Sequence, residues 1–121
     1  MFLSMNKYSV ILLAVAIGLM TSCRRVDNQS RTIKLPGLKN TECGTIISNA
    51  IARYAHMPNM VKAIQTDSMV FNYEERTLVI TYDSMKTEIK NIEHVIAQTG
   101  FAANEIPADP EGVKKLPASC R

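Results

Sequence analysis

The sequence has 121 residues, of which 46% are hydrophobic and 21% charged, and its formal net charge at pH 7 is +3. This length allows one folded domain rather than two. Because the net charge is small and no long run of like charges occurs, a nucleic-acid-binding function gains little support, and we expect no nucleic acid among the partners.

The N-terminal part of the chain has the pattern of a secretion signal. Residues 8–20 are apolar and uncharged, and as a helix they would span about 20 Å, too short for the hydrocarbon core of a membrane but typical of a signal-peptide core. Thr21 and Ser22 precede Cys23, and small residues before a cysteine resemble the lipobox of bacterial lipoproteins. We therefore predict a signal peptide at 1–22, a lipid on Cys23, and a protein held on a membrane of the cell envelope, facing the periplasm or the cell surface.

The predicted lipidated cysteine and a polar linker occupy 23–31, and the first regular element follows. Residues 32–35 alternate between polar and apolar, which predicts a strand ended by Pro36 and Gly37. Between 43 and 54 the apolar side chains recur at spacings of three and four, which predicts one face of a helix. Asn40 or Thr41 would cap that helix.

A hairpin and a second helix complete the pattern. Residues 69–73 and 77–82 each alternate, and the charged residues 74–76 between them predict a turn. A second helix is predicted around 89–96, with Thr87 as its N-cap and Gly100 as its C-terminal stop.

The last elements are a short strand expected at 101–106 and a tail at 107–121, loop-like because of its three prolines, with one helical turn at 111–115. The resulting order is β-α-β-β-α-β. It predicts an α+β, ferredoxin-like fold, with two helices on one face of a four-stranded antiparallel sheet.

The loop before the first helix, residues 37–43, resembles the Gly-Met-x-Cys-x-x-Cys loop of the heavy-metal-associated domain family. That family includes copper chaperones, mercury-binding periplasmic proteins and N-terminal domains of metal-pumping ATPases. The domain at 32–106 carries the resemblance, which includes residues 81–83 and 96–101. The tail segment 115–120 is similar to Leu-Pro-x-Cys-Cys endings of secreted members from gut-type bacteria.

The resemblance implies a soft metal ion, typically Cu(I), held by two thiolates, since soft ions prefer sulfur ligands. This sequence departs from the family pattern at two positions. Leu38 stands at the methionine position and Asn40 at the first cysteine, so that only Cys43 remains.

Three interpretations of Cys43 and Cys120 remain open. They could form a disulfide, because exported cysteines tend to be oxidised and Cys23 is consumed by lipid. They could instead be two thiolate ligands of a soft metal, favoured at Cys43 by the helix N-terminus, with His56 as a third ligand only if the first helix is short. Alternatively, Cys43 is a half-buried helix residue and Cys120 a free tail thiol.

Other candidate residues favour ordinary roles. His94 is expected on the surface, and Met57, Met60, Met69 and Met85 lack a close repeat and are expected in the core or loops. Because the sequence contains no Ser/His/Asp set, phosphate-binding loop or paired-carboxylate pattern, we expect no enzyme. Two functions stay in play: soft-metal binding or trafficking through Cys43 and Cys120, and a structural or protein-interaction module stabilised by their disulfide.

Overall fold

A computed structural model describes residues 25–121. The predicted signal peptide and Cys23 lie outside these residues. No helix in the described part is long and apolar enough to cross a membrane.

The described residues form one antiparallel sheet in the order β1-β3-β2. β1 (Asn28–Lys34) pairs with β3 (Thr77–Asp83) along its whole length, and β2 (Val70–Asn72) pairs with the first half of β3. Leu78, Ile80 and Tyr82 on β3 are buried while Val79 between them is exposed, so that one face of the sheet is covered and the other is open. β1 begins four residues earlier than predicted, so that the last four residues of the expected linker pair with β3.

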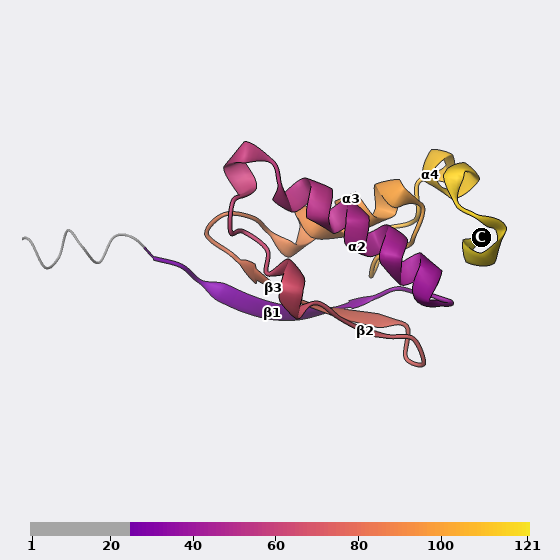
Figure 1. The fold of residues 1–121 in the computed structure, drawn as a ribbon, viewed down its shortest axis with the longest axis horizontal. Coiled ribbons are helices and arrows are strands. Elements are labelled where there is room, and N and C mark those ends of the chain that lie inside the picture. Colours follow the sequence, from indigo (N-terminus) through magenta and orange to yellow (C-terminus); the bar gives the residue numbers. More distant parts are fainter. Residues whose placement is uncertain (1–24) are drawn as a thin grey trace, which may run out of the picture.

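Two main helices lie over the covered face (Figure 1). α2 (Thr41–Ala55) begins at Asn40, one of the two predicted caps, and α3 (Ile89–Thr99) ends at Gly100, whose φ of 113° suits glycine. The predicted N-cap Thr87 is wrong: the N-cap is Glu88, which makes no side-chain cap. The Thr87 hydroxyl instead shares a 2.9 Å hydrogen bond with the Tyr54 hydroxyl of α2.

Shorter helical turns occupy the connections and the tail. Between α2 and β2 lie η1 (Pro58–Met60) and η2 (Thr66–Ser68), and the tail contains α4 (Pro110–Lys115) and η3 (Ala118–Cys120). α4 confirms the helical turn predicted in the tail. The tail is, however, packed on the domain, because the Asp109 amide donates to the Ala97 carbonyl of α3 at 2.9 Å.

The predicted fourth strand at 101–106 is absent from the sheet of the described residues. This segment makes a tight turn closed by a bridge between Ala103 and Ile106, and Asn104 adopts a left-handed φ of 52°. Asn104 contacts the outer edge of β1 through one residue only: its side-chain oxygen accepts from the Lys34 amide at 2.8 Å, and its own amide donates to the Lys34 carbonyl at 2.9 Å. An asparagine side chain thus replaces the backbone pairing of a strand.

The core lies between the helices and the covered face of the sheet, and the tail contributes to it. Each fully buried aliphatic side chain stabilises the fold by about 1.5 to 3 kcal/mol relative to exposure. The core cluster includes Ile33, Leu35, Leu38, Cys43, Ile47, Ile51, Leu78, Ile80, Ile92, Ile96, Phe101, Leu116 and Cys120.

Candidate functional site: a buried cysteine pair

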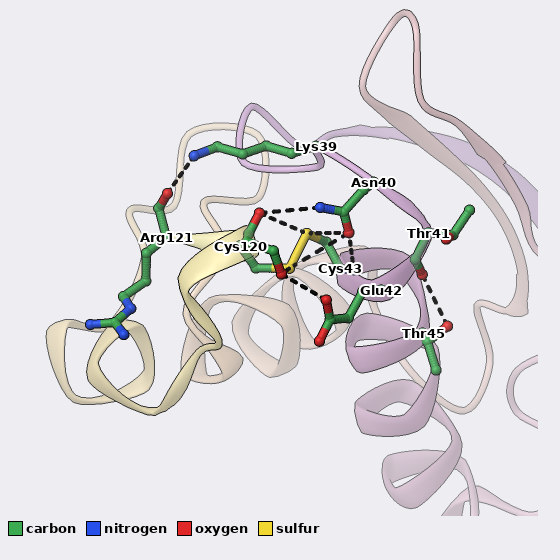
Figure 2. Close-up of a disulfide and its surroundings, with 9 residues drawn as sticks. Lys39, Asn40, Thr41, Glu42, Cys43, Thr45, Cys120 and Arg121 are labelled. Atoms are coloured by element: carbon green, nitrogen blue, oxygen red, sulfur yellow. Dashed lines mark hydrogen bonds between the residues drawn. A yellow bond between two sulfur atoms is a disulfide. The ribbon is translucent and has the colours of Figure 1, made fainter.

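The two cysteines of the described domain meet at the N-terminal end of α2 (Figure 2). Cys43 lies in the first turn of α2 and Cys120 in η3, and their sulfur atoms are joined by a disulfide with the Cα atoms 5.7 Å apart. The two residues are 77 positions apart in sequence. Both are buried, Cys43 completely. The tail therefore places the Cys120 sulfur beside Cys43, at the loop that precedes α2.

Asn40, three residues before Cys43, binds both the helix and the tail. Its Oδ1 accepts from the Cys43 amide at 3.1 Å, which caps α2, and its Nδ2 donates to the Ser119 carbonyl at 3.2 Å. The same Oδ1 lies 3.3 Å from Cys43 Sγ and 3.9 Å from Cys120 Sγ. One side chain thus aligns the two backbone segments that carry the sulfurs.

Two further polar contacts hold the C-terminal residues against the start of α2. The Ser119 hydroxyl donates to Glu42 Oε2 at 2.7 Å, and the Lys39 ammonium donates to the Arg121 carbonyl. Figure 2 shows these groups around the disulfide. Neither contact involves sulfur, so the tail meets the start of α2 through polar groups as well as through the S–S bond.

Close backbone packing positions the tail before it reaches the cysteine. A Cβ added to Gly112 of α4 would lie 2.4 Å from the Gln98 carbonyl oxygen and 2.7 Å from the Gly100 amide, so only glycine fits there. Leu116 then enters the core. No sequence pattern indicates this role, because the close approach is between segments that are distant in the chain.

The other predicted ligands lie elsewhere. His56 is the C-cap of α2, about 20 Å along the helix from Cys43 at 1.5 Å per residue, because the helix is long rather than short. His94 is exposed, as predicted. Within residues 25–121, no group of three or more His, Cys, Asp or Glu side chains is arranged to hold a metal ion. A metal ion at this site would therefore be coordinated by the two cysteine sulfurs.

The four methionines lie against the core or in loops, as predicted. Met60 and Met69 pack against the core, whereas Met57 and Met85 are exposed. None of the four lies in the shell of residues drawn around the cysteine pair in Figure 2.

Comparisons with known proteins bear on the fold. No family model and no curated protein matches the chain. Its structure is similar to that of oxidized MerP from Ralstonia metallidurans CH34, with a TM-score of 0.53 and 22% identity over 64% of this chain and 96% of that one. It is also similar to the CopZ metallochaperone, with a TM-score of 0.50 and 16% identity over 62% of this chain and 98% of that one. The heavy-metal-associated-like fold predicted from the sequence is thereby confirmed.

Proposed function

We propose that this chain is a lipid-anchored protein of the cell envelope that binds a soft metal ion, Cu(I) first among them, through Cys43 and Cys120 in their reduced state. The observation that carries the proposal is the meeting of two sulfurs at the start of α2, with their Cα atoms 5.7 Å apart. Two adjacent thiolates are the ligand set that soft ions prefer. The fold is shared with a protein named as a metallochaperone.

The oxidised and reduced states differ in what they can bind. In the disulfide, each sulfur is bonded to the other and is not a thiolate that could bind a metal ion. A dithiol reductant would cleave the S–S bond by exchange, becoming a disulfide itself and leaving two thiols on this chain. Metal binding would then displace both thiol protons. The contacts of Lys39, Asn40 and Glu42 with the tail would keep the thiols together before the metal arrives.

A Cu(I) titration of the mature chain against a competing chelator tests the proposal, with Cys23→Ser in every sample so that only two thiols count. The reduced protein should bind one Cu(I), and the oxidised protein none. Cys43→Ser and Cys120→Ser should each abolish tight binding. The proposal fails if the reduced protein competes no better than the variant that lacks both cysteines.

A gain-of-function variant provides the matched positive control. Asn40→Cys combined with Cys120→Ser moves the second thiol from the tail to the loop, three residues before Cys43, where the resembled family has it. This variant should bind Cu(I) with one ion per chain. If this variant binds Cu(I) and the natural Cys43–Cys120 pair does not, the fold can hold the ion and the position of Cys120 in the tail prevents binding.

The second candidate function is a structural or protein-interaction module that does not bind metal. The observation that favours it is the burial of both cysteines in a formed disulfide, with no third ligand group among residues 25–121. A thiol count on protein taken directly from the envelope separates the two candidates. A fully oxidised and metal-free population under copper supplementation would favour this second function.

The lipid anchor is tested separately. The mature protein should carry fatty acid on its first residue, detectable by mass spectrometry, and Cys23→Ser should lose it and leave the membrane fraction. An unmodified protein that is released in soluble form would contradict the anchor without affecting the metal proposal.

We assign a binding role and no catalytic one to the domain.

A further inference from the structure

An exposed surface lies at the end of the domain where the described chain begins. It is built from residues 25–27, 57–62 and 84–86, and Figure 1 shows the start of β1, the η1 region and the loop after β3 at one end, with the C terminus at the other. Hydrogen bonds join the three segments: Lys86 Nζ donates to the Val61 carbonyl at 2.7 Å, and the Ser84 amide donates to the Asp27 carbonyl at 2.8 Å. We call these three segments the proximal surface.

The proximal surface concentrates exposed apolar side chains. Among the described residues, six large hydrophobic side chains are well exposed, and four of them belong to these three segments: Val26, Met57, Val61 and Met85. Met57 also lines a separate hollow between α2, α3 and α4. Single exposed apolar residues are ordinary, but a gathering of them at one end of a small domain marks an interaction site. The remaining two, Val70 and Val79, lie on the open face of the sheet.

Cationic side chains surround these apolar ones. Arg25, Lys62 and Lys86 are exposed, and both lysines line a shallow hollow together with Val26. Three aspartates lie near these cations. The Asp27 carboxylate accepts from Ser84 and Gln29, and Asp67 and Asp83 line the hollow, where the buried Asp83 accepts from the Asp27 and Met85 amides. Exposed apolar side chains beside lysines and an arginine suit the boundary between lipid headgroups and acyl chains.

The chain itself places this surface close to the predicted lipid. Because β1 begins at Asn28 and Asp27 is already bonded to β3 and its loop, the tether after Cys23 is short. Three residues of extended chain reach at most about 11 Å, which bounds the distance from Cys23 to Val26. A tether this short keeps the proximal surface next to any bilayer that holds the lipid.

We propose that the proximal surface rests on an anionic lipid bilayer, inserting Val61 and its apolar neighbours while Lys62 and Lys86 bind headgroups. This inference rests on the lipid anchor of the proposed function and is independent of its metal site. It fixes the orientation of the domain: the Cys43–Cys120 site, at the opposite end, points away from the membrane.

The absence of Trp from the natural sequence makes a single-Trp test direct. Val61→Trp places the reporter on the proximal surface, and Val70→Trp is its matched control, because the two valines are 57% and 59% exposed. The lipidated full-length mature variants are reconstituted into phosphatidylcholine vesicles containing phosphatidylglycerol, with and without brominated acyl chains. We expect bromine to quench Trp at 61 and not at 70, together with a shorter emission wavelength at 61.

The charge contribution is measured with Lys62→Ala and Lys86→Ala in the Val61→Trp background. The ratio of inserted to free orientation should fall about fivefold for each lysine, which corresponds to about 1 kcal/mol per charge near an anionic surface. The effect should disappear on phosphatidylcholine alone. Circular dichroism of each variant confirms that the fold is kept.

The outcomes separate this inference from the anchor. If the protein floats with the vesicles but Trp at 61 is quenched no more than Trp at 70, the anchor stands and the docked orientation is wrong. If the protein carries no lipid and does not float, the anchor fails and the inference fails with it. A blue-shifted but unquenched Trp at 61 would point to a protein on this surface and would overturn the bilayer assignment.

Discussion

Removing the Cys43–Cys120 disulfide should cost this domain a large part of its stability. The bond closes a loop of 77 residues. In the chain-entropy model a loop of that length restricts the unfolded chain by about 4.5 kcal/mol at 25 °C. Small domains are stable by only about 5 to 15 kcal/mol, so the variant in which both cysteines are serine should be marginal at 37 °C.

Urea unfolding of the mature chain, with Cys23→Ser throughout, measures this loss. Comparing the oxidised protein with the double serine variant should show a fall of about 4 kcal/mol in the unfolding free energy extrapolated to water. For a domain of this size the melting temperature should fall by about 20 °C or more. The oxidised protein treated with reductant should match the variant, which separates loss of the crosslink from the effect of serine in the core.

A difference below about 1 kcal/mol between the oxidised protein and both disulfide-free samples would refute the reasoning. It would mean that the unfolded chain keeps the tail close to the start of α2 without the bond, so that the crosslink removes little entropy from it. A thiol titration of each sample shows whether the intended redox state was present.

Three further substitutions test the contacts that shape the fold. Asn104→Ala removes the side-chain bonds to the Lys34 amide and to Glu93, together with a residue type suited to left-handed φ, but keeps the backbone bond to the Lys34 carbonyl. Urea unfolding should therefore show a loss of about 2 to 4 kcal/mol; a loss below about 1 would contradict its role as a strand substitute. Gly112→Ala would meet backbone and should lose about 1 to 3 kcal/mol, whereas Gly44→Ala meets only the end of a tyrosine side chain and should lose less; equal melting temperatures would be the contrary result. Ser84→Ala should raise the pKa of the Asp27 carboxyl, which hydrogen bonds from the Ser84 hydroxyl and then Gln29 hold below its ordinary 3.8. Because the pKa of Asp27 is lower in the folded state, the stabilisation that its charge provides is present above pH 3.8 and is lost as the pH falls through the folded-state pKa. NMR titration of Asp27 measures this pKa, and an unchanged pKa in the variant would contradict the reasoning.

Local patterns predicted the two helices and the hairpin because each is determined by neighbours in sequence. The spacing of apolar residues from Cys43 to Tyr54 matches α2, and Gly100 ends α3 in a left-handed conformation that glycine adopts without strain. Asn40 was one of two candidate caps, and its short side chain reaches the Cys43 amide. These features need no information about the rest of the fold.

The predicted fourth strand was wrong and the docking of the tail was left open, because distant contacts determine both. Residues 101–106 follow the second helix, where the predicted β-α-β-β-α-β order places a strand, yet Asn104 turns the chain and bonds Lys34 and Glu93 with its side chain. The tail is positioned by Gly112 against the end of α3, a contact that only the three-dimensional arrangement reveals. For the same reason the sequence left open whether Cys120 reaches Cys43.

The placement of the two predicted functional ends constrains how a metal could be exchanged. β1 runs from the proximal surface at Asn28 to the loop before α2, and its seven residues alone span about 20 Å. If the proximal surface docks on the bilayer, the cysteine pair lies at the end of the domain away from the headgroups, with the length of β1 between the two ends. A partner that delivers reductant or metal would then approach from the aqueous side, and it would have to displace the Ser119 and Arg121 contacts to reach the sulfurs. Removing the last residue, Arg121, should therefore speed reduction of the disulfide without moving the membrane-facing reporter at Val61, whereas equal rates would show that the tail end does not guard the site.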